Sequence, residues 1–235
     1  MSALEAVAYS HGLVALTAWL ARPQGTPRAA ILVLPTIANV TPAVERRAAM
    51  LADRGYLALI ADFYGEPVTE PGGAAPLAEK LRADTDHYRA RLAAALDLLR
   101  SLPEAEGLPV AAIGYCMGGQ AALELARDGH DLIAAVSFHG ILSTGRAAQP
   151  GAVKARLLVC HGDADPLVPR EQVLAFWDEM DSAGANWHFH AYSGVKHGFT
   201  DPGSDTRGMP AIGYDASADR QSWAAMISLF DELLT

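Results

Sequence analysis

Short apolar runs alternate along this chain with longer segments in which apolar residues recur at helical spacing. A run of about four to eight apolar residues is typical of a buried strand. The strand candidates are Ala29–Leu34, Tyr56–Ala61, Val110–Gly114, Ala134–Phe138, Arg156–Cys160 and Trp187–Tyr192. Strands that alternate with helices predict an α/β fold with a mostly parallel central sheet flanked by helices.

Helices are expected between these strands. Thr41 and Pro42 have the residue types of a helix N-cap and of the first helical position, and this helix should end near Gly55. Gln120–Arg127 is predicted to start another helix. One long helix is predicted with an apolar face formed by Leu77, Leu81, Tyr88, Leu92, Ala95 and Leu99. Two later helices should bury Val173, Leu174, Phe176, Trp177 and Met180, and Trp223, Met226, Ile227, Phe230, Leu233 and Leu234.

Two segments lack such periodicity and are predicted to be loops above the sheet. They are Gly65–Pro76, which is rich in Gly and Pro, and Asp201–Tyr214. Neither has the composition of an interdomain linker, and the chain has 235 residues. Because domains run to ~100–200 residues, we expect one domain over residues 1–235.

Charge and cysteine content narrow the class of protein. Eighteen Lys and Arg against 27 Asp and Glu give a formal charge of −9, so neither a nucleic acid nor an anionic membrane surface is an expected partner. Two cysteines, Cys116 and Cys160, do not make a disulfide framework. The sequence also lacks a signal-peptide pattern and any apolar run of ~18 residues, which favours a cytoplasmic protein.

Glycines surround a cysteine in Gly114–Gly119 (GYCMGG), between a strand candidate and a helix candidate. This is the pattern of a nucleophile elbow with Cys in the Ser position. A tight turn from strand to helix holds the side chain above the sheet. The helix N-terminus behind it lowers a thiol pKa and offers N–H groups to an oxyanion. Taken alone, the pattern also fits an inert buried thiol.

Two later segments supply an acid and a base. His161–Pro169 (HGDADPLVP) follows one strand candidate, and Lys196–Phe199 (KHGF) follows the next. The chain order Cys, Asp, His is that of the α/β-hydrolase triad and of no other triad fold. Asp163 and Asp165 compete for the role of the acid.

These segments, with YLALIADFY at 56–64 and VSFHG at 136–140, resemble the dienelactone hydrolase family of the α/β-hydrolase superfamily over nearly the whole chain. The resemblance implies an α/β-hydrolase fold that cleaves small carboxylic esters or lactones. It implies Cys116 as nucleophile, Asp165 as acid and His197 as base. The family pattern places the acid just before the -x-x-Val-Pro segment, which favours Asp165 over Asp163.

The residue types then predict a mechanism. His197 takes the thiol proton or already holds it, and Asp165 fixes the imidazole tautomer. The Cys116 sulfur attacks the carbonyl, and water hydrolyses the resulting thioester. The oxyanion is expected at the N–H of Met117 and, by the resemblance, at that of Ile37. No cofactor and no metal is expected.

The sequence departs from the family at two positions. A Glu that contacts the thiol in well-known members corresponds to Thr36, so activation should rest on His197 and the helix terminus. An Arg that helps bind the substrate carboxylate corresponds to Asp201, which should repel an anionic lactone. Tyr64 is a further candidate for the pocket. His139 either lines the pocket or is a hydrogen-bonded structural histidine.

A cysteine-dependent hydrolase of small esters or lactones is therefore the leading hypothesis, with a small-molecule substrate and a monomeric protein. One alternative is a thioesterase or simple carboxylesterase that does not accept dienelactones. The other is a non-catalytic ligand-binding or redox-sensing relative, in which Cys116 is an oxidisable thiol.

Overall fold

The computed structural model describes residues 4–68 and 73–235 of the chain. They group into two compact units, residues 1–112 and 113–235. The expectation of a single domain over residues 1–235 stays a prediction. None of the helices in the described ranges is long and apolar enough to cross a membrane.

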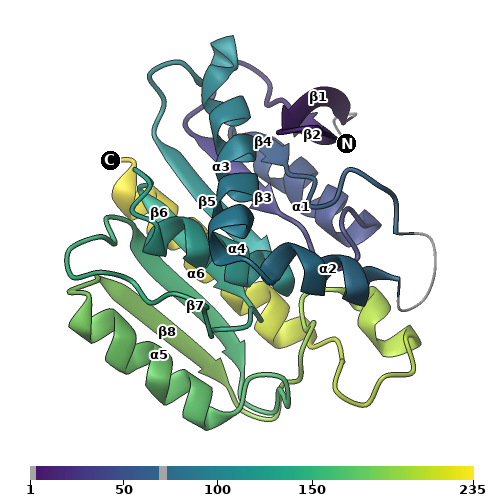
Figure 1. Cartoon of the computed structure of the whole chain (residues 1–235), viewed down its shortest axis with the longest axis vertical. Helices are drawn as coiled ribbons and strands as arrows, with labels where there is room; N and C mark the ends of the chain where they lie inside the picture. Colours follow the sequence, from purple (N-terminus) through teal and green to yellow (C-terminus); the bar gives the residue numbers. More distant parts are fainter. Residues whose placement is uncertain (1–3, 69–72) are drawn as a thin grey trace. The chain divides into compact units, whose positions relative to one another are not determined.

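The first unit contains four strands in the order β1-β2-β4-β3 (Figure 1). They are β1 (Glu5–His11), β2 (Val14–Ala21), β3 (Ala30–Leu34) and β4 (Leu57–Ile60). β1 and β2 form an antiparallel hairpin, β2 pairs antiparallel with β4, and β3 pairs parallel with β4. The hairpin is not predicted from the sequence, because β1 lies mostly open to solvent and has no continuous apolar run.

Helix α1 (Pro42–Ala52) begins as predicted. The Thr41 hydroxyl accepts a hydrogen bond from the N–H of Val44, and Gly55 adopts a φ of 86° just beyond the helix. Only glycine takes that left-handed conformation without steric cost, so the chain turns there toward β4. α1 packs against β4.

The single long helix predicted next is wrong. The structure has two helices, α2 (Ala74–Arg82) and α3 (Thr85–Ser101). The Asp84 carboxylate accepts hydrogen bonds from the N–H groups of Asp86 and His87, and it caps α3 rather than continuing α2. The predicted loop Gly65–Pro76 is also too long, because α2 begins at Ala74. Residues 69–72 of that loop lie outside the described residues.

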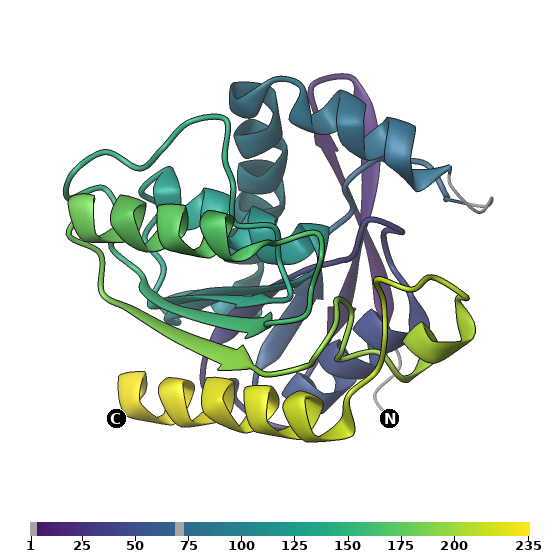
Figure 2. The ribbon, with the colours of Figure 1, turned by 90° about the horizontal axis from the view of Figure 1, so that it is seen from below.

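Strand β5 (Val110–Tyr115) starts in the first unit and ends in the second. The second unit continues with β6 (Ala134–Phe138), β7 (Arg156–Gly162) and β8 (Trp187–Tyr192), which pair parallel in that order. Its helices are α4 (Met117–Arg127), α5 (Arg170–Ser182) and α6 (Ala216–Leu233). Figure 2 shows α6 on one face of β6–β8 and α4 and α5 on the other. The predicted α/β class with mostly parallel strands is confirmed.

Helix α5 packs on β8 through aromatic side chains. The Trp177 and Trp187 rings stack with centroids 5.7 Å apart, and Phe176 meets Phe189 at 6.4 Å. The prediction that Leu174 shares this face is wrong, because its side chain is 55% exposed. Leu174 therefore points to solvent, whereas Val173, Phe176 and Met180 form the buried face of α5.

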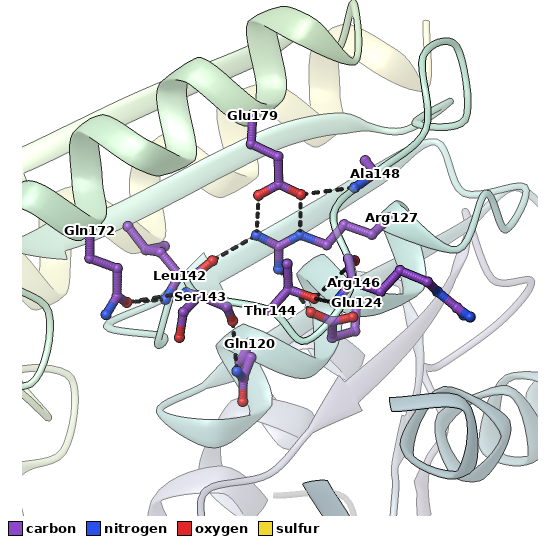
Figure 3. Close-up of polar contacts among 10 residues, drawn as sticks. All are labelled: Gln120, Glu124, Arg127, Leu142, Ser143, Thr144, Arg146, Ala148, Gln172 and Glu179. Atoms are coloured by element: carbon purple, nitrogen blue, oxygen red, sulfur yellow. Dashed lines mark hydrogen bonds and ion pairs between the residues drawn. The ribbon is translucent and has the colours of Figure 1, made fainter. Parts of the chain in front are cut away.

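A buried charged cluster holds the loop that follows β6 (Figure 3). The Arg127 guanidinium pairs with Glu124 at 3.0 Å and with both oxygens of Glu179 at 2.9 and 2.8 Å, and it donates to the Leu142 carbonyl at 2.6 Å. Gln172 then accepts from the Leu142 N–H at 2.7 Å. A cleft of about 320 Å³ lies between this loop and α5, and none of the candidate site residues lines it.

Candidate active site

Cys116 occupies the turn between β5 and α4, with φ 58° and ψ −119°. This left-handed region is strained for any residue with a Cβ. A Cβ on Gly114 would lie 1.9 Å from the Gly118 carbonyl oxygen, so the turn closes only with glycine there. Met117 is the first residue of α4. The first N–H groups of a helix have no acceptor within the helix, and its N-terminal end therefore favours an anion.

The structure brings Asp165 and His197 together. The Asp165 Oδ2 lies 2.7 Å from the His197 Nδ1, and both residues are only 3% exposed. The second carboxylate oxygen, Oδ1, accepts from the Leu167 N–H at 2.9 Å. With both oxygens engaged, the carboxylate is held in the orientation that selects one imidazole tautomer.

Backbone contacts fix the two loops that carry this pair. The His197 N–H donates to the Ala211 carbonyl, and the Gly213 N–H donates to the His197 carbonyl. A Cβ on Gly162, at the end of β7, would lie 2.5 Å from the Val195 carbonyl oxygen. The close approach that this glycine allows places the end of β7 against the segment leading to His197.

Electrostatics favour the charged form of His197. Burial alone would lower its pKa, but the hydrogen bond to Asp165 and the adjacent Cys116 thiol raise the pKa to about 10. The other ring nitrogen, Nε2, is buried and completes no hydrogen bond of normal geometry among the described residues. Because the Cys116 thiol is among the groups that raise this pKa, it lies near the ring.

The second carboxylate of the segment, Asp163, is turned to a different partner. Its two oxygens accept from Arg170 at 3.0 and 2.7 Å, in a surface pair. The Arg170 guanidinium lowers the pKa of Asp163. Because Asp163 is held by Arg170 and Asp165 by His197, the geometry favours Asp165 as the partner of the base.

His139 lies at the end of β6 and is 2% exposed. Its Nδ1 lies 3.1 Å from the Cys116 backbone nitrogen and its Nε2 lies 2.9 Å from the Thr200 Oγ1. The sequence leaves open whether His139 lines a pocket or is structural. In the structure its two nitrogens are engaged with the elbow and with the segment after His197.

In the first unit, the loop after β3 is built as a rigid turn. The Thr36 Oγ1 accepts from the Ala38 N–H at 3.2 Å, and the Tyr64 hydroxyl donates to the Ile37 carbonyl at 2.9 Å. Tyr64 is only 8% exposed. Thr36 and Tyr64 therefore shape the turn that presents Ile37.

Hydrogen bonds of Asn39 and Asp62 hold this turn in place. Sequence reasoning does not identify either residue as a candidate. The Asn39 side chain donates to Asp62 at 2.8 Å and accepts from the Phe63 N–H at 3.1 Å. The Asp62 carboxylate also accepts from the N–H groups of Tyr64 and Gly65 at 2.9 Å each. The signal that could have found them is a carboxylate directly after a buried strand, which marks a loop that needs a hydrogen-bond acceptor.

Comparison with known proteins decides the family. The model of the dienelactone hydrolase family matches residues 16–234. The chain belongs to the dienelactone hydrolase family. The α/β-hydrolase fold predicted from the sequence is thereby confirmed, and the chain is a hydrolase of lactones or esters.

Several relatives of this family are similar over most of their length. A dienelactone hydrolase-like promiscuous phosphotriesterase from metagenomic libraries is 37% identical, with 98% of both chains covered and a TM-score of 0.94. Carboxymethylenebutenolidase of Rhodococcus opacus is 25% identical over 228 residues, which is 87% of this chain and 81% of that protein. A probable 2-oxo-3-(5-oxofuran-2-ylidene)propanoate lactonase of Bradyrhizobium sp is 27% identical over 197 residues, 77% of this chain and 78% of that protein.

Asp201, the second position at which the sequence departs from the family pattern, has two partners in the structure. Its carboxylate accepts from the Gly203 N–H at 2.8 Å, which caps the short helix η2 (Pro202–Thr206), and it pairs with Arg207. The side chain of Asp201 is 18% exposed and that of Arg207 is 40% exposed. A more exposed guanidinium therefore lies beside the Asp201 carboxylate, and the repulsion of an anionic lactone stays a prediction.

Proposed function

We propose that this chain hydrolyses small carboxylic esters or lactones through Cys116, Asp165 and His197, by way of a thioester acyl-enzyme. The observation that carries the proposal is the 2.7 Å bond between Asp165 and His197, with the Cys116 thiol raising the pKa of that imidazole. A nucleophile, a base and an orienting acid in this order are the elements of triad chemistry.

The steps follow from these groups. The thiol proton resides on the His197 Nε2, and the Cys116 sulfur adds to the carbonyl carbon. The developing oxyanion lies at the Met117 N–H, where one such donor contributes ~2.7–4 kcal/mol. The Ile37 N–H stays the second predicted donor. The C–O bond then breaks, the leaving oxygen takes the proton from His197, and a thioester remains.

The second half of the cycle reverses these roles. His197 takes a proton from water, the hydroxide adds to the thioester carbonyl, and the C–S bond breaks to give the Cys116 thiolate and a carboxylic acid, which loses its proton to solvent. Asp165 compensates the imidazolium in both halves. We further propose a monomer in the cytoplasm that needs no cofactor. A role without catalysis is disfavoured, because a sensor thiol does not require the Asp165–His197 pair.

Hydrolysis of p-nitrophenyl acetate tests this function. Wild type should turn over, Cys116→Ala should not, and brief mixing should leave an acetyl group on Cys116 in the mass spectrum. Cys160→Ala is the matched control, because burial raises the pKa of the Cys160 thiol to about 12 and keeps it inert. Full activity in Cys116→Ala would refute the proposal.

A second candidate activity is the hydrolysis of phosphotriesters. It is favoured by the 37% identity and TM-score of 0.94 to the promiscuous phosphotriesterase. The Cys116 sulfur would displace the aryloxide from phosphorus, and water would then release the phosphodiester from sulfur. Diethyl p-nitrophenyl phosphate is the probe. Turnover that Cys116→Ala abolishes supports this activity, and ester turnover without it restricts the enzyme to carboxylic substrates.

A further inference from the structure

Two strained residues of the second unit contact each other. Among the described non-glycine residues of 113–235, only Cys116 and His139 have φ in the left-handed region, at 58° and 42°. The Cys116 N–H is shared between two acceptors, the Phe138 carbonyl at 3.0 Å and the His139 Nδ1 at 3.1 Å, and the second of these joins the two strained residues. Strained backbone persists only where surrounding contacts over-determine it. The side chain of one strained residue thus helps to hold the backbone of the other.

The hydrogen bonds of His139 define its tautomer. A backbone N–H only donates, so Nδ1 is the acceptor and a neutral ring carries its proton on Nε2. That proton faces the Thr200 Oγ1 at 2.9 Å, and Thr200 is 4% exposed. The imidazole thereby links the elbow to the segment just after His197.

Packing leaves the His139 ring little freedom. Its centroid lies 5.1 Å from that of His197 and 5.2 Å from that of Phe199, both near edge-on. Its backbone N–H donates to the Cys160 carbonyl at 2.8 Å. Because the ring is packed on these sides, it cannot shift easily, and groups bonded to it keep fixed positions relative to one another.

We propose that His139 is a positioning residue, which holds the nucleophile elbow and the base-carrying segment at a set separation through one neutral imidazole bonded to Cys116 and Thr200. The inference rests on the proposed function. Cys116 and His197 lie on different segments, so the geometry between them depends on what fixes those segments. A misplacement of ~1 Å in a reacting group costs roughly 100-fold in rate.

Paired substitutions separate this role from simple packing. Thr200→Val removes the partner of Nε2 at nearly constant volume, and Thr200→Ser restores a hydroxyl. His139→Phe removes both side-chain hydrogen bonds and keeps a flat ring, while the Cys116 N–H keeps its bond to the Phe138 carbonyl. His139→Asn tolerates positive φ and keeps an acceptor for the Cys116 N–H, but it is too short to reach Thr200.

His190→Asn, on the exposed edge strand β8, is the matched control.

Two readouts are needed, one of them independent of turnover. The first is the pH profile of Cys116 alkylation by iodoacetamide, located by mass spectrometry. The second is kcat and KM for p-nitrophenyl acetate. We expect Thr200→Val to lower kcat and neutral-pH alkylation about tenfold and KM hardly at all, and His139→Phe to lower them roughly 100-fold. Thr200→Ser and His190→Asn should stay near wild type, with His139→Asn in between.

Wild-type alkylation profiles and kcat in folded Thr200→Val and His139→Phe would overturn the proposal, even if both proteins melt at lower temperature. If His139→Phe does not fold, Thr200→Val against Thr200→Ser decides alone. If wild type hydrolyses no ester, the proposed function fails, but the alkylation profiles still report whether His139 positions Cys116.

Discussion

The second unit buries two charged groups that illustrate opposite uses of the same physics. Arg127 is surrounded by Glu124, Glu179 and the Leu142 carbonyl, with each guanidinium nitrogen engaged at 2.6–3.0 Å. His197 has Asp165 on one ring nitrogen, and the Cys116 thiol also raises the pKa of the ring. Both satisfy the rule that buried charge is paired. Only the second leaves an atom able to exchange a proton.

The backbone around Arg127 is regular, whereas the backbone around His197 is strained. Around Arg127 lie a regular helix and a loop fixed by complementary hydrogen bonds. Around His197 lie two residues with strained backbone, Cys116 and His139. Strain of this kind collects where geometry serves chemistry rather than stability. The comparison therefore predicts that substitutions around His197 lower activity, and that substitutions of Arg127 lower stability.

The largest effect should come from Asp165→Asn. The amide keeps the shape but presents the wrong partner to the His197 Nδ1, so kcat should fall about 10³–10⁴-fold, the scale of the analogous change in other triads. The thermal midpoint should move little. Steady-state kinetics and a thermal melt check both halves. Retention of even a tenth of the activity would remove Asp165 from the proposed triad.

Arg127→Met should give the reverse pattern. It leaves Glu124 and Glu179 without their cation, and breaking a buried pair typically costs ~3–5 kcal/mol of unfolding free energy. Urea denaturation measures this loss, and kcat of the folded fraction should stay within the range of wild type. A large loss of kcat in Arg127→Met with unchanged stability would contradict this prediction and would show that Arg127 serves activity, as His197 does.

The pH dependence of the rate sharpens the contrast. The folded pKa of His197 is raised from 6.5 to about 10, so the protonated ring persists across neutral pH. The stability that this shift contributes is fully present below pH 6.5 and is lost as the pH rises through about 10. Turnover should fall in the same alkaline range, because the leaving group loses its proton donor.

Asp165→Asn tests the cause of that alkaline limit. It removes a hydrogen bond that raises the pKa of His197, so its residual activity should decline at lower pH than in wild type. A pH–rate profile of both proteins decides this. An unmoved alkaline limb would mean that a group other than His197 sets it.

The smallest effect should come from the partly exposed pair Asp201–Arg207. Exposed ion pairs contribute ~0–1 kcal/mol, so Arg207→Ala should raise KM for an anionic ester up to about fivefold. KM for a neutral ester of equal size should not change, and added salt should shrink the difference. Equal effects on both esters would show that Arg207 supports the loop rather than the substrate.

Much of the candidate site can be predicted from the sequence because its signals are local. The glycines around Cys116 indicate a tight turn within a few residues, so the elbow follows from the Gly114–Gly119 segment alone. Thr41 and Pro42 predict the start of α1 in the same way. Asp165 and His197 follow from strand order and family pattern, since parallel strands bring their carboxyl ends to one edge.

The sequence by itself determined most of the parallel strands, the place of the elbow and the triad order of the chain. The tertiary structure decided the break at Asp84, the hydrogen bonds between Asn39 and Asp62, and the two bonds of His139. Each of these depends on an atom of one segment meeting an atom of another at hydrogen-bond distance. Local spacing carries no information about such distances, because they arise only when loops and helices pack.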